Sequence, residues 1–251
     1  MGKYHIAEQC LEEKNKNYII KEVVMYNLYF GSCFDILEKI KDDSVDTVIC
    51  DPPYNIKISE WDKNFDIEKL SYFLSKKTKE NSNIIIFQGY SNVCETKSIL
   101  DRYFIMQDWI IYDRIKGRGA TKHLVSTRED ILWYTKGKNY TFNKIYSNIK
   151  KKTKGFGIKN GSEFRALSNV WTDISPIVPW SKEKTIHPSQ KPEMLIDRCV
   201  KIWTNENDIV LDPTMGSGTT GVCCLKNKRN FIGIENKKEY FDIAKNRIEN
   251  I

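Results

Sequence analysis

Apolar residues along this chain fall into two patterns, short continuous runs and longer stretches with helical spacing. The runs SVDTVIC at 44–50 and NIIIF at 83–87 are rich in β-branched residues, which predicts strands buried on both faces. Strands that alternate with helices predict an α/β fold with a mixed, mostly parallel sheet covered on both faces. The other predicted strands are 26–29, 106–112, 130–134, 208–211 and 230–234, and the predicted helices are 34–40, 67–79, 91–101, 191–203, one ending near 226, and 238–250.

Two segments depart from this pattern, and we expect domain boundaries at their ends. Residues 1–25 are polar, permit a helix and carry no motif, so we expect an N-terminal arm. Residues 137–185 contain Lys and Asn runs with scattered glycines and no stable period. We expect loops and short elements there, inserted into the core rather than forming part of it. The core would then comprise residues 26–136 and 186–251.

The excess positive charge is concentrated in one segment. The whole chain has a net charge of +7, and residues 109–165 contain 14 Lys and Arg against four Asp and Glu. A concentrated basic face is expected where a protein meets a polyanion. A solvated, lysine-rich surface would give the same count, so composition leaves both interpretations open.

The composition argues against a membrane protein, a disulfide framework and a metal site. No stretch approaches the roughly 18 apolar residues of a membrane helix, and the N-terminus lacks an apolar signal segment. We therefore expect a cytoplasmic protein. The seven cysteines form an odd set without C-x-x-C spacing. This favours buried thiols in a reducing compartment and predicts no bound metal.

A glycine-rich turn follows the predicted strand at 208–211. In the segment DPTMGSGTTG, Gly216 and Gly218 allow the backbone to turn tightly and to approach a ligand. Glu235 ends the next predicted strand, where a carboxylate can accept hydrogen bonds from both ribose hydroxyls. This context predicts a site for a nucleoside cofactor, and a packing turn without a ligand is the alternative.

The glycines alone do not distinguish a dinucleotide from S-adenosylmethionine. Asp212 lies on the turn itself, and its carboxylate would repel a pyrophosphate. The methionine end of S-adenosylmethionine instead carries an ammonium and a sulfonium, which a carboxylate attracts. Asp212 therefore favours S-adenosylmethionine.

A second motif, Asp51-Pro52-Pro53-Tyr54, directly follows the predicted strand at 44–50. An exocyclic adenine nitrogen is a poor nucleophile because its lone pair is delocalised into the ring. Acceptors for its two hydrogens draw it toward tetrahedral geometry, and the Asp51 carboxylate and the Pro52 carbonyl can serve as these acceptors. Tyr54 offers a flat face to a base extruded from a duplex. The motif therefore predicts methylation of an amino group on a base.

These two motifs and the segment HPSQKP at 187–192 together resemble the amino-methyltransferases of bacterial restriction–modification systems. Their order resembles the β-class, and the resemblance covers about 26–251. It implies a Rossmann-like S-adenosylmethionine-dependent methyltransferase fold, with 26–136 as the catalytic half, 137–185 as a target-recognition insertion and 186–251 as the cofactor half. In this family D-P-P-Y is typical of adenine-N6 enzymes and S-P-P-Y of cytosine-N4 enzymes. Members often form homodimers.

The motifs and the resemblance together predict three groups of site residues. The catalytic residues are Asp51, Pro52, Pro53 and Tyr54. The cofactor residues are Asp212, Thr214, Gly216, Gly218, Thr219, Thr220 and Glu235, with Ser189, Gln190 and Lys191 near the methionine carboxylate and Ser32 and Cys33 near the adenine. The DNA-binding residues are Arg114, Lys116, Arg118, Lys122, Arg128, Lys150, Lys151, Lys152 and Lys154.

Three positions depart from the family pattern. Thr214 stands where the family usually has Phe, which implies looser packing against the cofactor. Ser32 takes the place of a common Asp, which removes one expected contact to the cofactor adenine. Arg128-Glu129 replaces a frequent His-Glu pair before Asp130, and we assign it no role at this stage.

The other functions explain less of the sequence. An NAD-dependent oxidoreductase would account for the glycine turn and Glu235 but not for D-P-P-Y, HPSQKP or the basic segment. A non-catalytic DNA-binding protein would account only for the basic segment, and no helix-turn-helix or zinc pattern supports it. We expect double-stranded DNA as the substrate, with single-stranded DNA and RNA left open.

Overall fold

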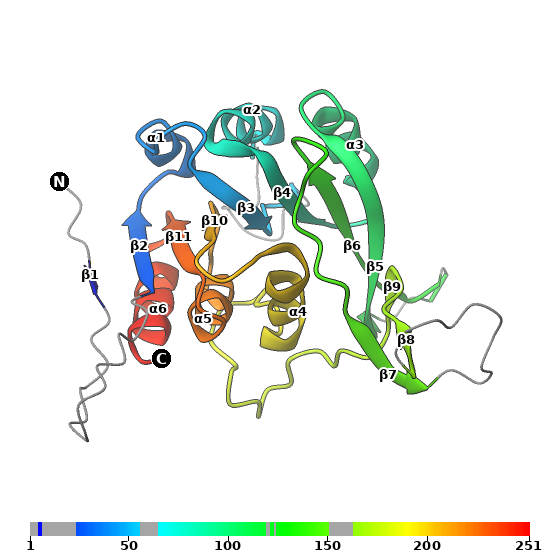
Figure 1. Cartoon of the computed structure of the whole chain (residues 1–251). Helices are drawn as coiled ribbons and strands as arrows, with labels where there is room; N and C mark the ends of the chain where they lie inside the picture. Colours follow the sequence, from blue (N-terminus) through cyan, green and yellow to red (C-terminus); the bar gives the residue numbers. More distant parts are fainter. Residues whose placement is uncertain (1–4, 7–23, 56–64, 119–120, 123, 151–162) are drawn as a thin grey trace, which may run out of the picture.

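The fold is built on one large mixed sheet. The computed structural model describes residues 5–6, 24–55, 65–118, 121–122, 124–150 and 163–251. Nine strands form the sheet in the order β1-β2-β11-β10-β3-β4-β6-β5-β9 (Figure 1). These strands are β1 (His5–Ile6), β2 (Met25–Phe30), β3 (Val45–Cys50), β4 (Thr78–Gln88), β5 (Ile105–Arg118), β6 (Ser126–Thr135), β9 (Val170–Trp171), β10 (Ile209–Asp212) and β11 (Asn230–Glu235). A separate antiparallel pair consists of β7 (Tyr146–Lys150) and β8 (Phe164–Ala166).

The central strands are parallel, and the sheet becomes antiparallel toward one side. β2, β11, β10, β3 and β4 pair in parallel. β6 then runs antiparallel to both β4 and β5. The reversal places the start of β6 beside the end of β4, since Asp130 pairs with Gln88. The predicted α/β fold with a mostly parallel sheet is confirmed.

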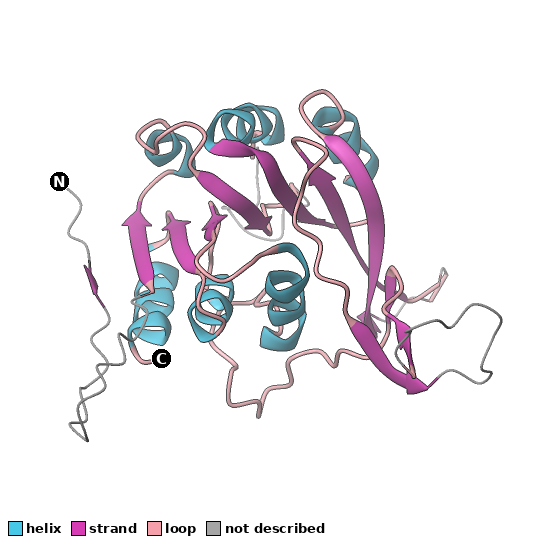
Figure 2. Ribbon diagram, in the orientation of Figure 1, coloured by secondary structure: helices cyan, strands magenta, loops and turns pink. Residues whose placement is uncertain are grey.

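Helices cover both faces of the sheet. α1 (Cys33–Leu37), α2 (Ile67–Lys77) and α3 (Val93–Leu100) lie on one face, and α4 (Glu193–Trp203), α5 (Thr219–Lys226) and α6 (Lys238–Glu249) lie on the other (Figure 2). Alternate residues of the central strands therefore enter different cores. Ile85 of β4 packs with the α4–α6 layer, whereas its neighbours Ile84 and Ile86 pack with the α1–α3 layer. This two-sided burial accounts for the continuous apolar runs in the sequence.

The segment 137–185 contributes to the core, and the expectation that it stands apart from the core is wrong at its C-terminal end. β9 pairs with β5 in the main sheet. Trp171 and Ile174 are buried among core residues, and the Trp171 ring stacks on Trp203 at 6.2 Å between centroids. The sequence did not indicate β9 because a strand of two residues is too short to show a hydrophobic period.

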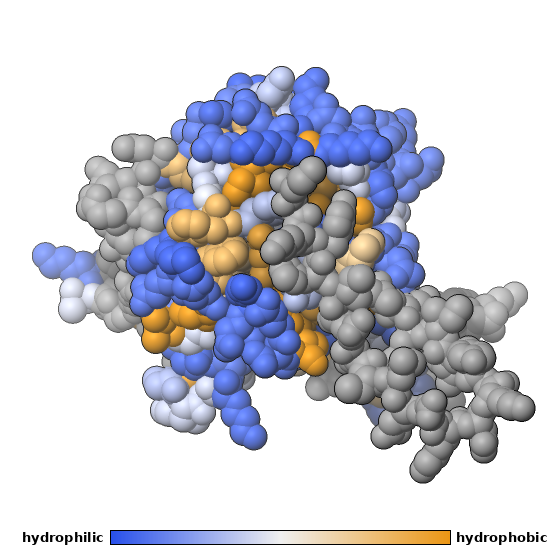
Figure 3. Space-filling view, turned by 90° about the vertical axis from the view of Figure 1, so that its left-hand side faces the viewer, coloured by the Kyte–Doolittle hydropathy of each residue, from blue (hydrophilic) through white to orange (hydrophobic). Residues whose placement is uncertain are grey.

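The N-terminal segment is described only in part. His5 and Ile6 pair with Tyr26 and Met25 as a short edge strand, and most of the predicted arm, 7–23, lies outside the described residues. The side of the molecule that carries β2 and α6 shows apolar residues near its centre and hydrophilic residues around them (Figure 3). Phe30 and Phe241 lie on these two elements, with ring centroids 5.7 Å apart. Within the described part of the chain, no helix is long and apolar enough to cross a membrane.

Candidate active site

The ends of the central strands open into one cavity of about 630 Å³. Asp51 follows β3, Thr214 follows β10 and Glu235 ends β11, and all three line the cavity. Loops after neighbouring parallel strands form a crevice at the same edge of the sheet, which is where ligands bind in this kind of fold. The glycine motif and the D-P-P-Y motif thus share one cavity.

The two glycines of the turn differ in what they do. Gly216 lines the cavity with φ +52°, and a Cβ there would lie 2.9 Å from Nε2 of His187. Gly218, with φ +76°, precedes α5, and a Cβ there would lie 2.9 Å from Cα of Ala244 on α6. Gly218 is not among the cavity-lining residues. Its glycine is therefore required for packing of the turn against α6, while Gly216 keeps the backbone open to the cavity.

Two buried carboxylates face the cavity at this end. Asp212 accepts hydrogen bonds from the Thr220 hydroxyl at 2.6 Å and from the Thr214 amide at 3.1 Å. Burial raises the pKa of Asp212 to about 7, more than these hydrogen bonds lower it. Glu235 accepts the Gly216 and Lys237 amides at 2.9 and 2.8 Å, and burial raises its pKa as well. Both groups gain stability as anions if a cationic or hydrogen-donating ligand enters.

Of the two residues predicted to contact the cofactor adenine, one lines the cavity and the other does not. Cys33 lines the cavity as a buried thiol, and burial raises its pKa to about 12, so it stays neutral. Ser32 precedes α1 and is not among the residues that line the cavity. Gly31 does line it, and its amide donates to the Glu235 carbonyl at 3.0 Å.

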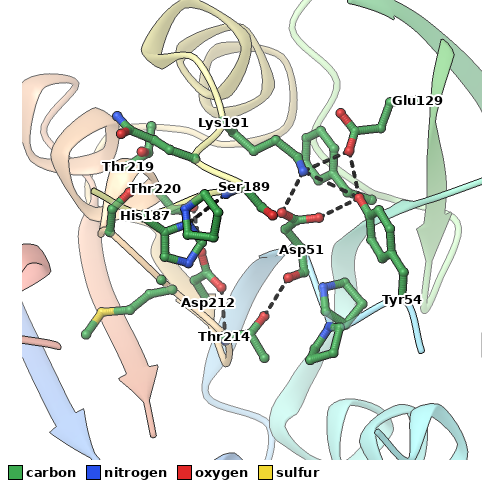
Figure 4. A pocket seen from close by; sticks show the side chains of 18 of the residues that line it. Asp51, Tyr54, Glu129, His187, Ser189, Lys191, Asp212, Thr214, Thr219 and Thr220 are labelled. Atoms are coloured by element: carbon green, nitrogen blue, oxygen red, sulfur yellow. Dashed lines mark hydrogen bonds and ion pairs between the residues drawn. The ribbon is translucent and has the colours of Figure 1, made fainter. Parts of the chain in front are cut away.

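The catalytic motif belongs to a compact network of charged groups (Figure 4). The Tyr54 hydroxyl lies 2.6 Å from Oδ1 of Asp51 and 2.8 Å from Oε1 of Glu129, and its single hydrogen can be donated to one of them at a time. Nζ of Lys191 lies 2.6 Å from Oδ2 of Asp51 and 2.8 Å from Oε1 of Glu129. One cation therefore holds two carboxylates together.

Burial and the ion pairs determine the charges in this network. Burial raises the pKa of Asp51, against the opposing effect of Lys191. Burial alone would also raise the pKa of Glu129, but the attraction and hydrogen bond of Lys191 prevail and lower it. Burial would lower the pKa of Lys191, yet the two carboxylates raise it above its usual value. Lys191 therefore remains an ammonium between two acceptors.

Two of the residues predicted to lie near the methionine carboxylate have side chains that contact other residues of the protein. Lys191 was expected near the cofactor carboxylate, but its ammonium contacts Asp51 and Glu129. Gln190 was expected there too, but its side chain accepts from Thr185 N at 2.8 Å and donates to the Glu183 carbonyl at 2.6 Å. Gln190 thus holds the loop before α4 in shape, and it lines the cavity together with Ser189 and Lys191.

Glu129, which the sequence analysis singled out without assigning it a role, belongs to the site. It immediately precedes Asp130 of β6, and the antiparallel pairing of β6 with β4 carries it to the cavity. The signal was the acidic pair Glu129-Asp130 at the start of an apolar strand. Recognising it required knowing that β6 reverses the direction of the sheet, which the parallel pattern of the other strands did not indicate.

His187 also lies in the site, although no role had been assigned to it. Its ring contacts the edge of Tyr240, with centroids 4.3 Å apart, and it faces the Gly216 turn. Burial, reinforced by the nearby lysines, lowers its pKa to about 4. His187 is therefore neutral near pH 7 and acts as a flat wall of the cavity.

Thr214 links the two motifs. Its hydroxyl donates to the Asp51 carbonyl at 3.1 Å and lies 3.4 Å from Sγ of Cys50. Thr219 and Thr220 open α5 and also line the cavity. The small polar residue at 214 therefore forms a direct hydrogen bond between the glycine turn and the end of β3.

The predicted DNA-binding residues are distributed unevenly. Arg114 and Arg128 line the cavity, where Arg114 donates to the Ser126 and Thr127 carbonyls and Arg128 pairs with Asp130 at 2.8 Å. Lys122 and Lys150 are exposed. Lys116 and Arg118 belong to β5, and their side chains lie outside the description, as do Lys151, Lys152 and Lys154 altogether.

Comparison with known proteins points to one family. A family model described as DNA methylase matches residues 45–246. The type II methyltransferase M1.MboII of Moraxella bovis is 32% identical over 240 residues, covering 85% of this chain and 92% of that protein. The DNA adenine methyltransferase YhdJ of Escherichia coli (strain K12) is 32% identical over 248 residues, covering 87% of this chain and 81% of that protein.

Solved structures share the fold. A structure of M1.HpyAVI in complex with SAM is 32% identical and matches with a TM-score of 0.66, covering 89% of this chain and all of that chain. The cytosine-N4-specific PvuII DNA methyltransferase, at 16% identity and a TM-score of 0.65, shows a likeness of fold alone.

Proposed function

Because the chain belongs to the DNA methylase family, we propose that it transfers a methyl group from S-adenosylmethionine to N6 of adenine in double-stranded DNA. The observation that carries this proposal is the Asp51 carboxylate, which lies in the same cavity as the Gly216 turn. A base amino group held by Asp51 and a methyl donor held by the turn would meet there. The site would serve a restriction–modification system, and the similarity to proteins named type II methyltransferases supports this proposal.

The residues around the turn fit S-adenosylmethionine. The Asp212 carboxylate suits the cationic methionine end, and the Glu235 carboxylate keeps lone pairs for two ribose hydroxyls. The same Asp212 carboxylate would repel the pyrophosphate of NAD, which disfavours an oxidoreductase. The cofactor supplies a methyl group bonded to a positively charged sulfur, an electrophile that needs no further activation by the protein.

The protein activates the nitrogen. Asp51 accepts one amino hydrogen and the Pro52 carbonyl accepts the other, which restores the nitrogen lone pair. As the nitrogen–carbon bond forms and the bond between that carbon and the cofactor sulfur breaks, the excess proton of the nitrogen would pass to Asp51 and then to solvent. Lys191 keeps Asp51 ionised before the step, and Glu129 holds Lys191 and the Tyr54 hydroxyl in place. Tyr54, the loop Pro52-Pro53 and the cavity wall would hold the base.

Adenine is favoured over cytosine by the acidic first residue of D-P-P-Y and by the relative named as a DNA adenine methyltransferase. Cytosine-N4 methylation is the second candidate, because the name of the matching family model refers to both N6 and N4 methyltransferases. The basic segment would contact DNA phosphates through its lysines and base edges through Arg114 or Arg118. We retain 137–185 as the region that reads the target sequence, and we propose a homodimer as a further property.

The test compares substrates and products directly. Duplex DNA, single-stranded DNA and RNA are incubated with S-adenosylmethionine labelled in its methyl group, and digested product is examined by mass spectrometry. We expect N6-methyladenine, formed fastest in duplex DNA. If the product contained only N4-methylcytosine, the target base would be cytosine rather than adenine. If methyl transfer occurred only to RNA, the substrate would be RNA rather than DNA. Calorimetry should detect binding of S-adenosylmethionine and far weaker binding of NAD.

A further inference from the structure

The β5–β6 hairpin carries exposed apolar residues close in sequence to residues that line the cavity. Arg114 of β5 and Ser126 of β6 both line the cavity. Next to Ser126 along the chain, Val125 is 50% exposed and Leu124 is 92% exposed. Leu124 is the most exposed large apolar side chain in the part of the chain that the structure describes. Two exposed apolar side chains thus directly precede a residue that lines the cavity.

The backbone at this end of the hairpin is irregular. The register of β5 against β6 shifts between Asp113 and Arg118, and Ile115 lies within that shift. Ile115 has φ +62°, a left-handed conformation that is unfavourable for a β-branched residue, and its side chain is 53% exposed. Its amide donates to Oδ1 of Asp113 at 2.7 Å, which stabilises the turn. Strain of this kind persists where the surrounding structure enforces it, and it clusters at functional sites.

Cationic residues accompany the apolar ones. Arg114 of β5 and Arg128 of β6 line the cavity, and Lys122 is exposed two positions before Leu124. Apolar side chains surrounded by cationic ones suit binding to a DNA duplex. The phosphates attract the cationic side chains, and an apolar side chain can insert between base pairs. A second copy of this chain would bring like charges together at the same place.

We propose that Leu124, flanked by Val125 and Ile115, is a wedge that enters the duplex beside the target base and fills the space left when that base moves into the cavity. This inference rests on the proposed function, because only a flipped base leaves such a space. Removing a base from the stack loses stacking and pairing, and an inserted apolar side chain replaces part of the lost contact.

The test varies Leu124 and the opposing base together. The substrate is a duplex containing the sequence that the wild-type chain is found to methylate. It is compared with the same duplex carrying an abasic site opposite the target, and with the single strand. For Leu124→Ala we expect the single-turnover rate on the matched duplex to fall about ten-fold. The rate on the other two substrates should stay near the wild-type value, because neither requires the target base to leave an intact pair.

Three measurements complete the design. Leu124→Met should retain most of the rate, and Ile105→Ala, an exposed apolar residue at the start of β5, should behave as wild type. With 2-aminopurine at the target position, the fluorescence increase on binding should be smaller for Leu124→Ala than for the wild type. Sedimentation should find the oligomeric state unchanged.

Other outcomes would overturn the wedge. If Leu124→Ala lowered the single-turnover rate equally on all three substrates, Leu124 would have a general structural role. If it did not lower the rate on the matched duplex, Leu124 would not act as a wedge. A changed oligomeric state would instead make the hairpin an interface between copies. If the wild-type chain methylated none of the substrates, the proposed function itself would fail, which is a separate result.

Discussion

The two ends of the cavity are constructed differently. The cofactor end comes from adjacent strands, β10 and β11, with the turn that joins β10 to α5. Its carboxylates, Asp212 and Glu235, are held by amides and a hydroxyl. The catalytic end joins residues from distant parts of the chain, and Lys191 supplies it with a cation. The carboxylates of the cofactor end are thus held by neutral donors, whereas those of the catalytic end share the Lys191 cation.

This difference predicts separate responses to mutation. A change at the catalytic end should lower the rate of methyl transfer with little effect on cofactor affinity. A change at the cofactor end should weaken cofactor binding with less effect on the rate at saturation. A substitution that altered both properties equally would break the distinction.

The largest effect is expected for Asp51→Ala. Without the acceptor for the amino hydrogen, methyl transfer should fall by about a thousand-fold or more. Cofactor affinity should stay within about two-fold of the wild-type value, because Asp51 faces the base rather than the adenosine. Single-turnover kinetics and calorimetry measure the two quantities. Substantial residual transfer would show that another group accepts the proton.

Lys191→Met should have the next largest effect and decides to which end Lys191 belongs. Removing the ammonium leaves the Asp51 and Glu129 carboxylates together in a buried site, so the pKa of one carboxyl rises further. The rate near pH 7 should fall by about a hundred-fold and recover as the pH rises through that raised pKa, since the ionised Asp51 is the active form.

A second substitution provides the control for this prediction. Lys191→Met combined with Glu129→Gln removes the repulsion and should restore part of the rate at neutral pH. A large loss of cofactor affinity with an unchanged rate at saturation would contradict the catalytic assignment and return Lys191 to the methionine carboxylate.

Glu235→Ala should mainly affect binding. Losing hydrogen bonds to a charged acceptor costs about 1 to 3 kcal/mol, so calorimetry should record a cofactor dissociation constant increased by roughly five- to 150-fold. The rate at saturating cofactor should change little. Glu239→Ala, an exposed acidic residue at the start of α6, is the matched control and should leave the affinity unchanged.

The smallest effect is a pH dependence at Asp212. Its pKa of about 7 means that the carboxyl ionises near neutrality, and only the anion attracts the sulfonium and ammonium of the cofactor. Affinity should therefore increase by up to about ten-fold from pH 6 to pH 8. Asp212→Asn should remove this part of the pH dependence while retaining any contribution from the ligand itself. A wild-type profile identical to that of Asp212→Asn would contradict the assignment.

The same carboxyl affects the free protein in the opposite direction. Because its pKa is raised from 3.8 to about 7 on folding, the folded state binds its proton more tightly than the unfolded chain. This contribution to stability is complete below pH 3.8 and is lost as the pH rises through about 7. Thermal unfolding without cofactor should reveal the trend, and Asp212→Asn should diminish it.

The elements that the sequence predicted correctly are those whose burial is visible in a short stretch of sequence. The strand predicted at 44–50 is β3 (Val45–Cys50), and the one predicted at 230–234 is β11 (Asn230–Glu235), because local burial shapes their sequence. β4 begins earlier than its apolar run, at Thr78, and its polar residues 79–81 are exposed. The early start reflects the pairing of Thr78 with Val45 of β3, which a register irregularity separates from the pairing that begins at Asn83.

The site shows the same division. Asp51, Gly216 and Glu235 were found from contiguous motifs, and all three line the cavity. The contact between Lys191 and Asp51 joins positions 140 residues apart, and no local pattern encodes it. Glu129 depends in addition on the reversed direction of β6. Motifs therefore identified the participants, whereas the arrangement of charges among them required the three-dimensional structure.

The pairing of β3 with β10 has a consequence for evolution. These parallel neighbours bring the Asp51 and Thr214 loops into hydrogen-bond contact, although 163 positions separate the two residues. What the chemistry requires is that the two strands lie side by side, whichever of them is encoded first. A gene rearrangement that exchanged the order of the two halves while keeping β3 beside β10 would preserve the site. Selection at this cavity therefore acts on adjacency in the sheet and leaves the linear order of the coding sequence free to change.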